Sequence, residues 1–106
     1  MMCENVVVKN APDASWTFLT NHAHVLLAIA AEPEIRIRDI ASEVGITERA
    51  AHRIVADLEE AGYLQVSKVG RRNEYVVLKE MPLRHPAEQH HRIGELLKVL
   101  AHEPKK

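Results

Sequence analysis

The stretch Arg38–Gly62, RDIASEVGITERAAHRIVADLEEAG, decides the fold. Its apolar spacing predicts a short helix over residues 39–44, a tight turn at Gly45 and a longer helix that starts at Thr47. Gly45 stands where the first helix needs a left-handed terminating residue, and Thr47 is a favoured N-cap residue. Gly62 is placed to end the second helix in a Schellman-type turn. Two helices joined by a short glycine-containing turn form a helix-turn-helix.

The second of these helices carries a cationic stripe opposite its apolar side. At 100° per residue, the apolar side contains Ala51, Ile54, Val55 and Leu58. Arg49, Arg53 and Ala56 fall on the other side, with His52 at its flank. A narrow cationic stripe with a small residue in it suits close approach to a DNA major groove. Glu48, in the first turn, either accepts a hydrogen bond from a cytosine amine or simply favours the helix dipole.

A β-hairpin is predicted directly after the helix-turn-helix. Leu64–Val69 and Glu74–Leu78 are strand-like, and residues 70–73 join them as a turn. The cations in and beside this turn are Lys68, Arg71 and Arg72. A helix-turn-helix followed by a hairpin with a basic tip is typical of a winged helix that holds a DNA backbone or minor groove. The fold class is therefore mainly α with a small β-hairpin wing.

Two further helices are expected to flank this unit. The first covers about residues 16–31 with Ser15 as its N-cap, and the last covers about residues 87–101 after a proline-bounded connector. We divide the chain into an N-terminal arm (1–14), a winged helix-turn-helix domain (15–80) and a connector with a C-terminal dimerisation helix (81–106). The residues expected at a dimer interface are Trp16, Phe18, Ile93, Leu96, Leu97 and Leu100.

The composition excludes several classes of protein. The chain has 106 residues, a formal charge of −1 and a single cysteine, Cys3, which rules out a disulfide framework. DNA binding must therefore rest on local segregation of charge. The longest apolar run, Val25–Ala31, is too short to span a bilayer, and no signal peptide is recognisable. We expect a cytoplasmic protein. The four glycines are isolated and no nucleophile has an identifiable base, so we expect no enzyme.

The chain resembles the MarR/ArsR-type winged-helix regulators of prokaryotes. The segments that carry the resemblance are Asp39–Ala41, Gly45–Thr47, Leu58–Leu64 and Val69–Tyr75. It implies a homodimer that binds an inverted-repeat operator in double-stranded DNA. The positions that it places on DNA are Glu48, Arg49, His52, Arg53, Ala56, Lys68, Arg71 and Arg72. Many relatives carry further cations where this chain has Ala56 and Asp57, and their absence makes the wing more important.

Seven histidines raise the alternative of a metal- or pH-responsive regulator. They are His22, His24, His52, His85, His90, His91 and His102. Glu88 and His91 share one side of the expected last helix, and Cys3 could join them across a dimer. No spacing resembles a closed four-ligand site, so we predict no metal and no cofactor. His22 and His24 are interpreted as ordinary helix-face or interface residues.

The sequence therefore predicts a dimeric DNA-binding transcriptional regulator, most simply a repressor. The near-neutral charge leaves open a winged helix used for protein contact within a larger assembly. The operator sequence, the sign of regulation and any small-molecule effector are left open.

Overall fold

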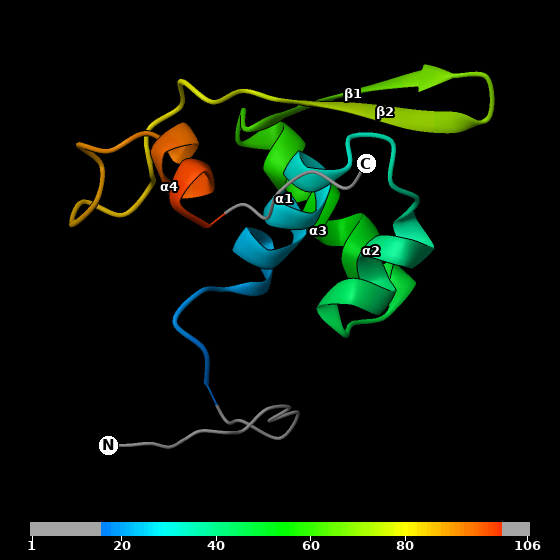
Figure 1. The fold of residues 1–106 in the computed structure, drawn as a ribbon, viewed down its shortest axis with the longest axis horizontal. Helices are drawn as coiled ribbons and strands as arrows, with labels where there is room; N and C mark the ends of the chain where they lie inside the picture. The colour runs from blue at the N-terminus through cyan, green and yellow to red at the C-terminus, as the bar shows by residue number, and fades with distance from the viewer. Residues whose placement is uncertain (1–15, 101–106) are drawn as a thin grey trace.

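The computed structural model describes residues 16–100, which form four helices and a two-stranded antiparallel hairpin (Figure 1). The elements are α1 (Asn21–Ala31), α2 (Ile37–Val44), α3 (Glu48–Glu60), β1 (Leu64–Val69), β2 (Arg72–Val77) and α4 (Ile93–Leu100). This is the predicted winged helix-turn-helix. The predicted N-terminal arm, the N-cap Ser15, Cys3 and His102 lie outside the described residues.

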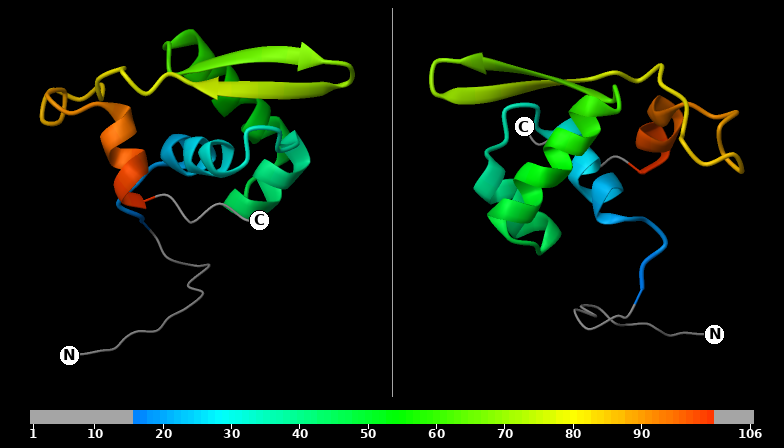
Figure 2. Two further views of the ribbon diagram at one scale, coloured as in Figure 1. Left: turned by 45° about the horizontal axis from the view of Figure 1, so that its top comes forward. Right: turned by 180° about the vertical axis from the view of Figure 1, so that it is seen from behind.

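The core lies where α1, α2 and α3 meet, and the hairpin and α4 close its sides (Figures 1 and 2). Its largest fully buried side chains are Val25, Leu26, Ile29, Ile40 and Leu64. Burying a side chain of this size contributes about 1.5–3 kcal/mol, and no charged or polar residue among those described is buried with them. The apolar side chains of all three helices therefore pack into one core, which fixes α2 relative to α3.

The predicted ends of α2 and α3 are confirmed. Gly45 is left-handed, with φ +86°, and its N–H donates to Ala41 O at 2.8 Å. The Thr47 hydroxyl accepts a hydrogen bond from Ala50 N at 3.0 Å. At the end of α3, Tyr63 N donates to Leu58 O at 2.9 Å and Gly62 N donates to Glu59 O at 3.1 Å. These two bonds, with Gly62 at φ +93°, make a complete Schellman motif.

The predicted start of the first helix is wrong. α1 begins at Asn21, five residues later than expected, and its N-cap is Thr20, whose side chain accepts from Ala23 N at 3.3 Å. Trp16 and Phe18 precede it in an irregular segment and are exposed. The Thr20 hydroxyl caps the helix at this point, and neither aromatic side chain lies in the core.

The hairpin turn is shorter than predicted. Val69 pairs with Arg72, so only Gly70 and Arg71 connect the strands, and β2 begins two residues earlier than expected. Gly70 has φ +65°, a conformation that suits a two-residue hairpin turn. One face of the hairpin packs Leu64 and Tyr75 against the core.

The last helix is also shorter than predicted. Residues 86–90 form turns rather than helix, and α4 begins at Ile93. The segment folds back on itself, because Leu83 N donates to His91 O at 3.0 Å and Ile93 N donates to Met81 O at 2.8 Å. The polar residues 88–92 have no apolar side to bury, so the helix begins where Ile93 and Leu97 reach the core.

Candidate nucleic-acid interface

The exposed side of α3 carries the residues that the sequence assigned to DNA. Ala51, Ile54, Val55 and Leu58 are buried, and Glu48, Arg49, His52, Arg53 and Ala56 are all exposed. Within residues 16–100, neither Arg49 nor Arg53 forms an ion pair with another side chain. Their guanidinium groups are therefore free to donate hydrogen bonds to an external acceptor.

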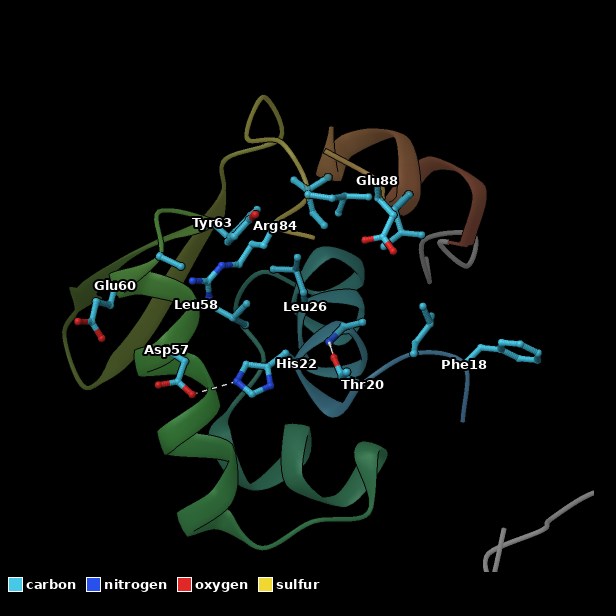
Figure 3. A pocket seen from close by; sticks show the side chains of 16 residues that line it. Phe18, Thr20, His22, Leu26, Asp57, Leu58, Glu60, Tyr63, Arg84 and Glu88 are labelled. Atoms are coloured by element: carbon cyan, nitrogen blue, oxygen red, sulfur yellow. Dashed lines mark hydrogen bonds and ion pairs between the residues drawn. The ribbon is translucent and has the colours of Figure 1, made fainter. Parts of the chain in front are cut away.

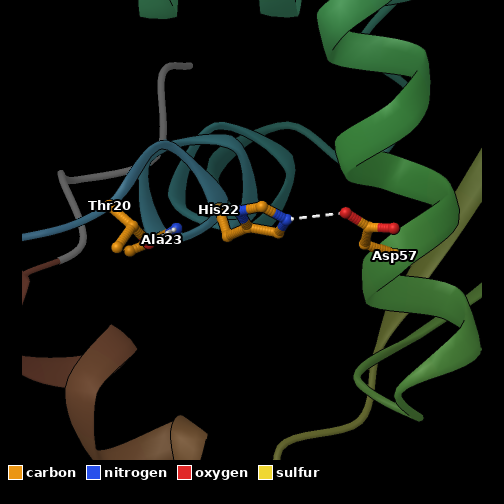
Figure 4. A network of polar contacts seen from close by, with 4 residues as sticks. All are labelled: Thr20, His22, Ala23 and Asp57. Carbon is orange, nitrogen blue, oxygen red and sulfur yellow. Dashed lines mark hydrogen bonds and ion pairs between the residues drawn. The ribbon is translucent and has the colours of Figure 1, made fainter.

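The charge of α3 changes sign along its length. In its first half Arg49 and Arg53 outnumber the single acid Glu48, and its last turns carry Asp57, Glu59 and Glu60. Asp57 Oδ2 contacts His22 Nε2 of α1 at 2.9 Å, and this contact ties the two helices together (Figure 4). Sequence reasoning missed this pair, because 35 residues separate its members. The cationic end of α3 is the end nearest to the turn that joins it to α2.

The hairpin presents a second group of cations. Lys68, Arg71 and Arg72 are all exposed at or beside its tip. Arg72 Nη1 lies 3.4 Å from Glu34 Oε1, a contact between exposed side chains that joins the wing to the α1–α2 loop. Tyr75 N donates to Pro33 O at 3.0 Å, so the same loop also supports the backbone of β2. The Glu34 contact was not predicted, and within the described residues Lys68 and Arg71 form no ion pair.

The hairpin extends away from the C-terminal end of α3, and α3 lies on the outside of the bundle (Figure 2). The predicted cations therefore come from two separate elements, the first half of α3 and the hairpin tip. Such an arrangement can contact a groove with one element and a phosphate backbone with the other.

A cavity of about 900 Å³ lies between α1, the second half of α3, the connector and α4 (Figure 3). Leu26, Leu58, Ile93 and Leu96 contribute apolar wall. The titratable side chains in the wall are His22, Asp57, Glu60, Tyr63, Arg84 and Glu88. No sequence pattern predicted this cavity, because four segments that are distant in the chain create it.

Tyr63 lies in the wall of this cavity and links α3 to the connector. Its hydroxyl donates a hydrogen bond to Pro82 O. Burial raises the pKa of the Tyr63 phenol above its ordinary value of 10.0, and the positive charge of Arg84 partly opposes that rise. Tyr63 therefore remains a neutral hydrogen-bond donor.

The six residues predicted for dimerisation do not form one exposed surface in a single chain. Trp16 and Phe18 are 67% and 90% exposed and stack edge to face, with ring centroids 4.9 Å apart. Leu96 is half-buried and Leu100 is exposed. Ile93 and Leu97 are buried in the core of their own chain. Trp16, Phe18 and Leu100 are the members available to a partner.

The histidines near α4 do not assemble a metal site. Within residues 16–100, no group of three or more His, Cys, Asp or Glu side chains is placed to hold a metal ion. Glu88 precedes α4 in a turn, so the expectation that it shares a helical face with His91 is wrong. His91 Nδ1 lies 2.5 Å from Glu95 Oε1, and this hydrogen bond lowers the pKa of the Glu95 carboxyl. None of the helices described is long and apolar enough to cross a membrane.

Comparisons with known proteins give a family and a similar structure. A family model described as MarR family matches residues 17–72, more than half of the chain. The chain is also similar to the PcaV transcriptional regulator from Streptomyces coelicolor, solved in complex with its natural ligand. The two share 27% sequence identity and a TM-score of 0.52, over 81% of this chain and 62% of the PcaV chain, so this chain spans less than two thirds of that length. A search of curated protein sequences gives no match.

Proposed function

Since the chain belongs to the MarR family, whose members are transcription regulators and not enzymes, we propose that it is a sequence-specific DNA-binding repressor. In this proposal it acts as a dimer on an inverted-repeat operator, in the cytoplasm. The ArsR side of the resemblance stays a prediction that the family match does not support. The observation that carries the proposal is that Arg49 and Arg53, on the exposed side of α3, form no ion pair within residues 16–100.

Each half of the surface has its own role in this proposal. Arg49 and Arg53 enter the major groove, where an arginine fork matches guanine O6 and N7 and discriminates by about 1–3 kcal/mol per contact. Glu48, His52 and Ala56 lie beside them on the same exposed side. Lys68, Arg71 and Arg72 hold the phosphate backbone, which gives affinity without sequence information.

Selection from random duplexes, followed by titration of the selected site at two salt concentrations, tests the proposal. We expect a palindromic site and an affinity that falls steeply with salt. Replacing Arg71 and Arg72 by Ala should weaken binding to all duplexes alike and flatten the salt dependence. Arg49→Ala should instead relax the sequence preference. Lys98→Ala, which removes an exposed cation from α4, is the matched control and should leave binding unchanged.

The dimer is tested separately. We propose that Trp16, Phe18 and Leu100 contact a second copy, with Leu96 beside them and with Ile93 and Leu97 supporting this surface from the core. Two recognition helices should then meet successive major grooves about 34 Å apart. A protein that sediments as a monomer at micromolar concentration contradicts the dimer and the palindrome together. Sedimentation of a Phe18→Ser variant should show a weakened dimer.

The main alternative is a winged helix used for protein contact. The overall formal charge of −1 is the observation that favours it. The same titration separates the two functions, because a protein-contact module shows little affinity for duplex DNA and little dependence on salt.

The cavity favours a regulator that responds to a small molecule. Its volume of about 900 Å³ is within the range of ligand sites, and its wall combines apolar side chains with a few charged ones. PcaV was solved with its natural ligand. A thermal-shift screen of small aromatic and aliphatic acids and amines tests this idea. Compounds that bind should release DNA, and Ala23→Trp, which adds a bulky side chain to the wall of the cavity, should weaken both effects.

A further inference from the structure

A histidine of α1, His22, contacts a carboxylate of α3, Asp57. His22 Nε2 lies 2.9 Å from Asp57 Oδ2, and both side chains are about half exposed, at 48% and 49%. A carboxylate has no N–H or O–H to give, so the imidazole Nε2–H donates this hydrogen bond. Figure 4 shows the imidazole reaching from α1 across to α3.

Asp57 has a second potential partner on its own helix. Arg53 lies four residues before it, and side chains four residues apart in a helix are neighbours that commonly form ion pairs. The structure contains no such pair, and Asp57 contacts His22 instead. Arg53 therefore keeps its guanidinium free while a carboxylate stands one turn away.

Resting on the DNA-binding function proposed above, we propose that His22 is a positioning residue for DNA recognition. By holding Asp57 against α1, it keeps that carboxylate from pairing with Arg53. Arg53 then meets DNA without first breaking an internal ion pair. Arg84, which also lines the cavity, forms no ion pair with Asp57 and lies beside Tyr63.

Removal of the imidazole tests the proposal directly. His22→Ala should free Asp57 to pair with Arg53 and weaken binding to the selected duplex by about 1.5- to 5-fold, the cost of breaking an exposed ion pair. Binding is measured as the dissociation constant from fluorescence anisotropy. Circular dichroism and the midpoint of thermal unfolding monitor the fold of each variant.

Asp57→Asn separates positioning from a merely structural link between α1 and α3. An amide oxygen at position 57 can still accept from His22 Nε2, so the double variant carries the distinction: if the contact only fastened the helices, His22→Ala/Asp57→Asn would bind DNA as weakly as His22→Ala. In our proposal Asp57→Asn binds at least as tightly as the unmodified protein, and His22→Ala/Asp57→Asn recovers the affinity that His22→Ala lost. The matched control is His22→Ala/Glu60→Gln, which removes a carboxylate from the same side of α3 two turns from Arg53. This control should not recover the affinity.

The effect of His22 should also depend on Arg53. In the Arg53→Ala background, adding His22→Ala should leave the dissociation constant unchanged. A His22→Ala protein that binds DNA normally, or one that Glu60→Gln rescues as well as Asp57→Asn does, overturns the proposal. Unmodified protein that binds no duplex in any salt refutes the proposed function instead, so the two failures are distinguishable.

Discussion

The helix-turn-helix and the C-terminal segment hold their places in different ways. In α1–α3, Thr20 and Thr47 cap two helix starts, Gly45 and Gly62 terminate two helix ends, and large side chains such as Ile40 are completely buried. In residues 79–100, a few backbone hydrogen bonds fold the connector back, and α4 buries only Ile93 and Leu97. We infer that the first region unfolds only with the whole domain, whereas the second can detach from it.

The largest effect is expected from the centre of the helix-turn-helix. Ile40 is fully buried between the helices, so Ile40→Ala removes apolar contacts and leaves a cavity. The free energy of unfolding should fall by about 2–5 kcal/mol. Chemical denaturation followed by circular dichroism measures it. Ile37→Ala, at a half-buried position in the same helix, should cost less. A loss below about 1 kcal/mol for Ile40→Ala would contradict the comparison, because the core of α1–α3 would then be packed no more tightly than the C-terminal segment.

The next effect concerns the attachment of α4. A Cβ at Gly94 would lie 2.9 Å from Lys79 Cβ and 3.1 Å from Lys79 O, closer than side chains pack. Gly94→Ala should therefore cost about 1–3 kcal/mol by overpacking. Hydrogen exchange should accelerate in residues 79–100 and stay slow in α1–α3. Lys98→Ala, at an exposed position of the same helix, is the control. Equal acceleration in both regions contradicts the independence of the C-terminal segment.

A smaller effect is expected at the start of α3. Thr47→Ala removes the hydroxyl that accepts from Ala50 N, and the free energy of unfolding should fall by about 1 kcal/mol. Thr47→Ser keeps the hydroxyl and should retain most of the stability. Thermal unfolding of both variants measures the difference. If they lose stability equally, the cap does not fix the start of α3.

The smallest effect tests the joint between the two regions. Tyr63→Phe removes the hydrogen bond to Pro82 O, at a cost of about 1 kcal/mol or less. Because the pKa of Tyr63 is raised in the folded chain, the folded state holds the phenol proton more tightly than the unfolded state does. Its contribution is present below pH 10 and is lost as the pH rises above that value. The stability advantage of the unmodified protein over Tyr63→Phe should therefore shrink above pH 10.

Most of the fold could be predicted because its signals are local. The turn at Gly45, the cap at Thr47 and the Schellman end at Gly62 each depend on residues within one helical turn, and all three are confirmed. The starts of α1 and α4 could not be predicted with equal success. Trp16 and Ala87 are both compatible with helix, and only the packed core decides which residues gain from extending it.

The candidate site divides in the same manner. Helical spacing alone placed Arg49 and Arg53 on the exposed side of α3. The partners of Asp57 and Arg72 depend on residues 35 and 38 positions away, so the folded chain was needed to find them. The observed turn is two residues shorter than the predicted one, because β2 begins at Arg72. The cations Lys68, Arg71 and Arg72 are nevertheless exposed, as predicted.

The reversal of charge along α3 has a consequence for the DNA-binding function proposed above. A rod with cations toward one end and carboxylates toward the other is a dipole, and the backbone adds a dipole of the same sense. A row of phosphates attracts the N-terminal end of such a rod and repels its C-terminal end. In the proposed function, the order of charges in α3 therefore favours an insertion in which the N-terminal tip of the helix leads and Glu59 and Glu60 stay outward.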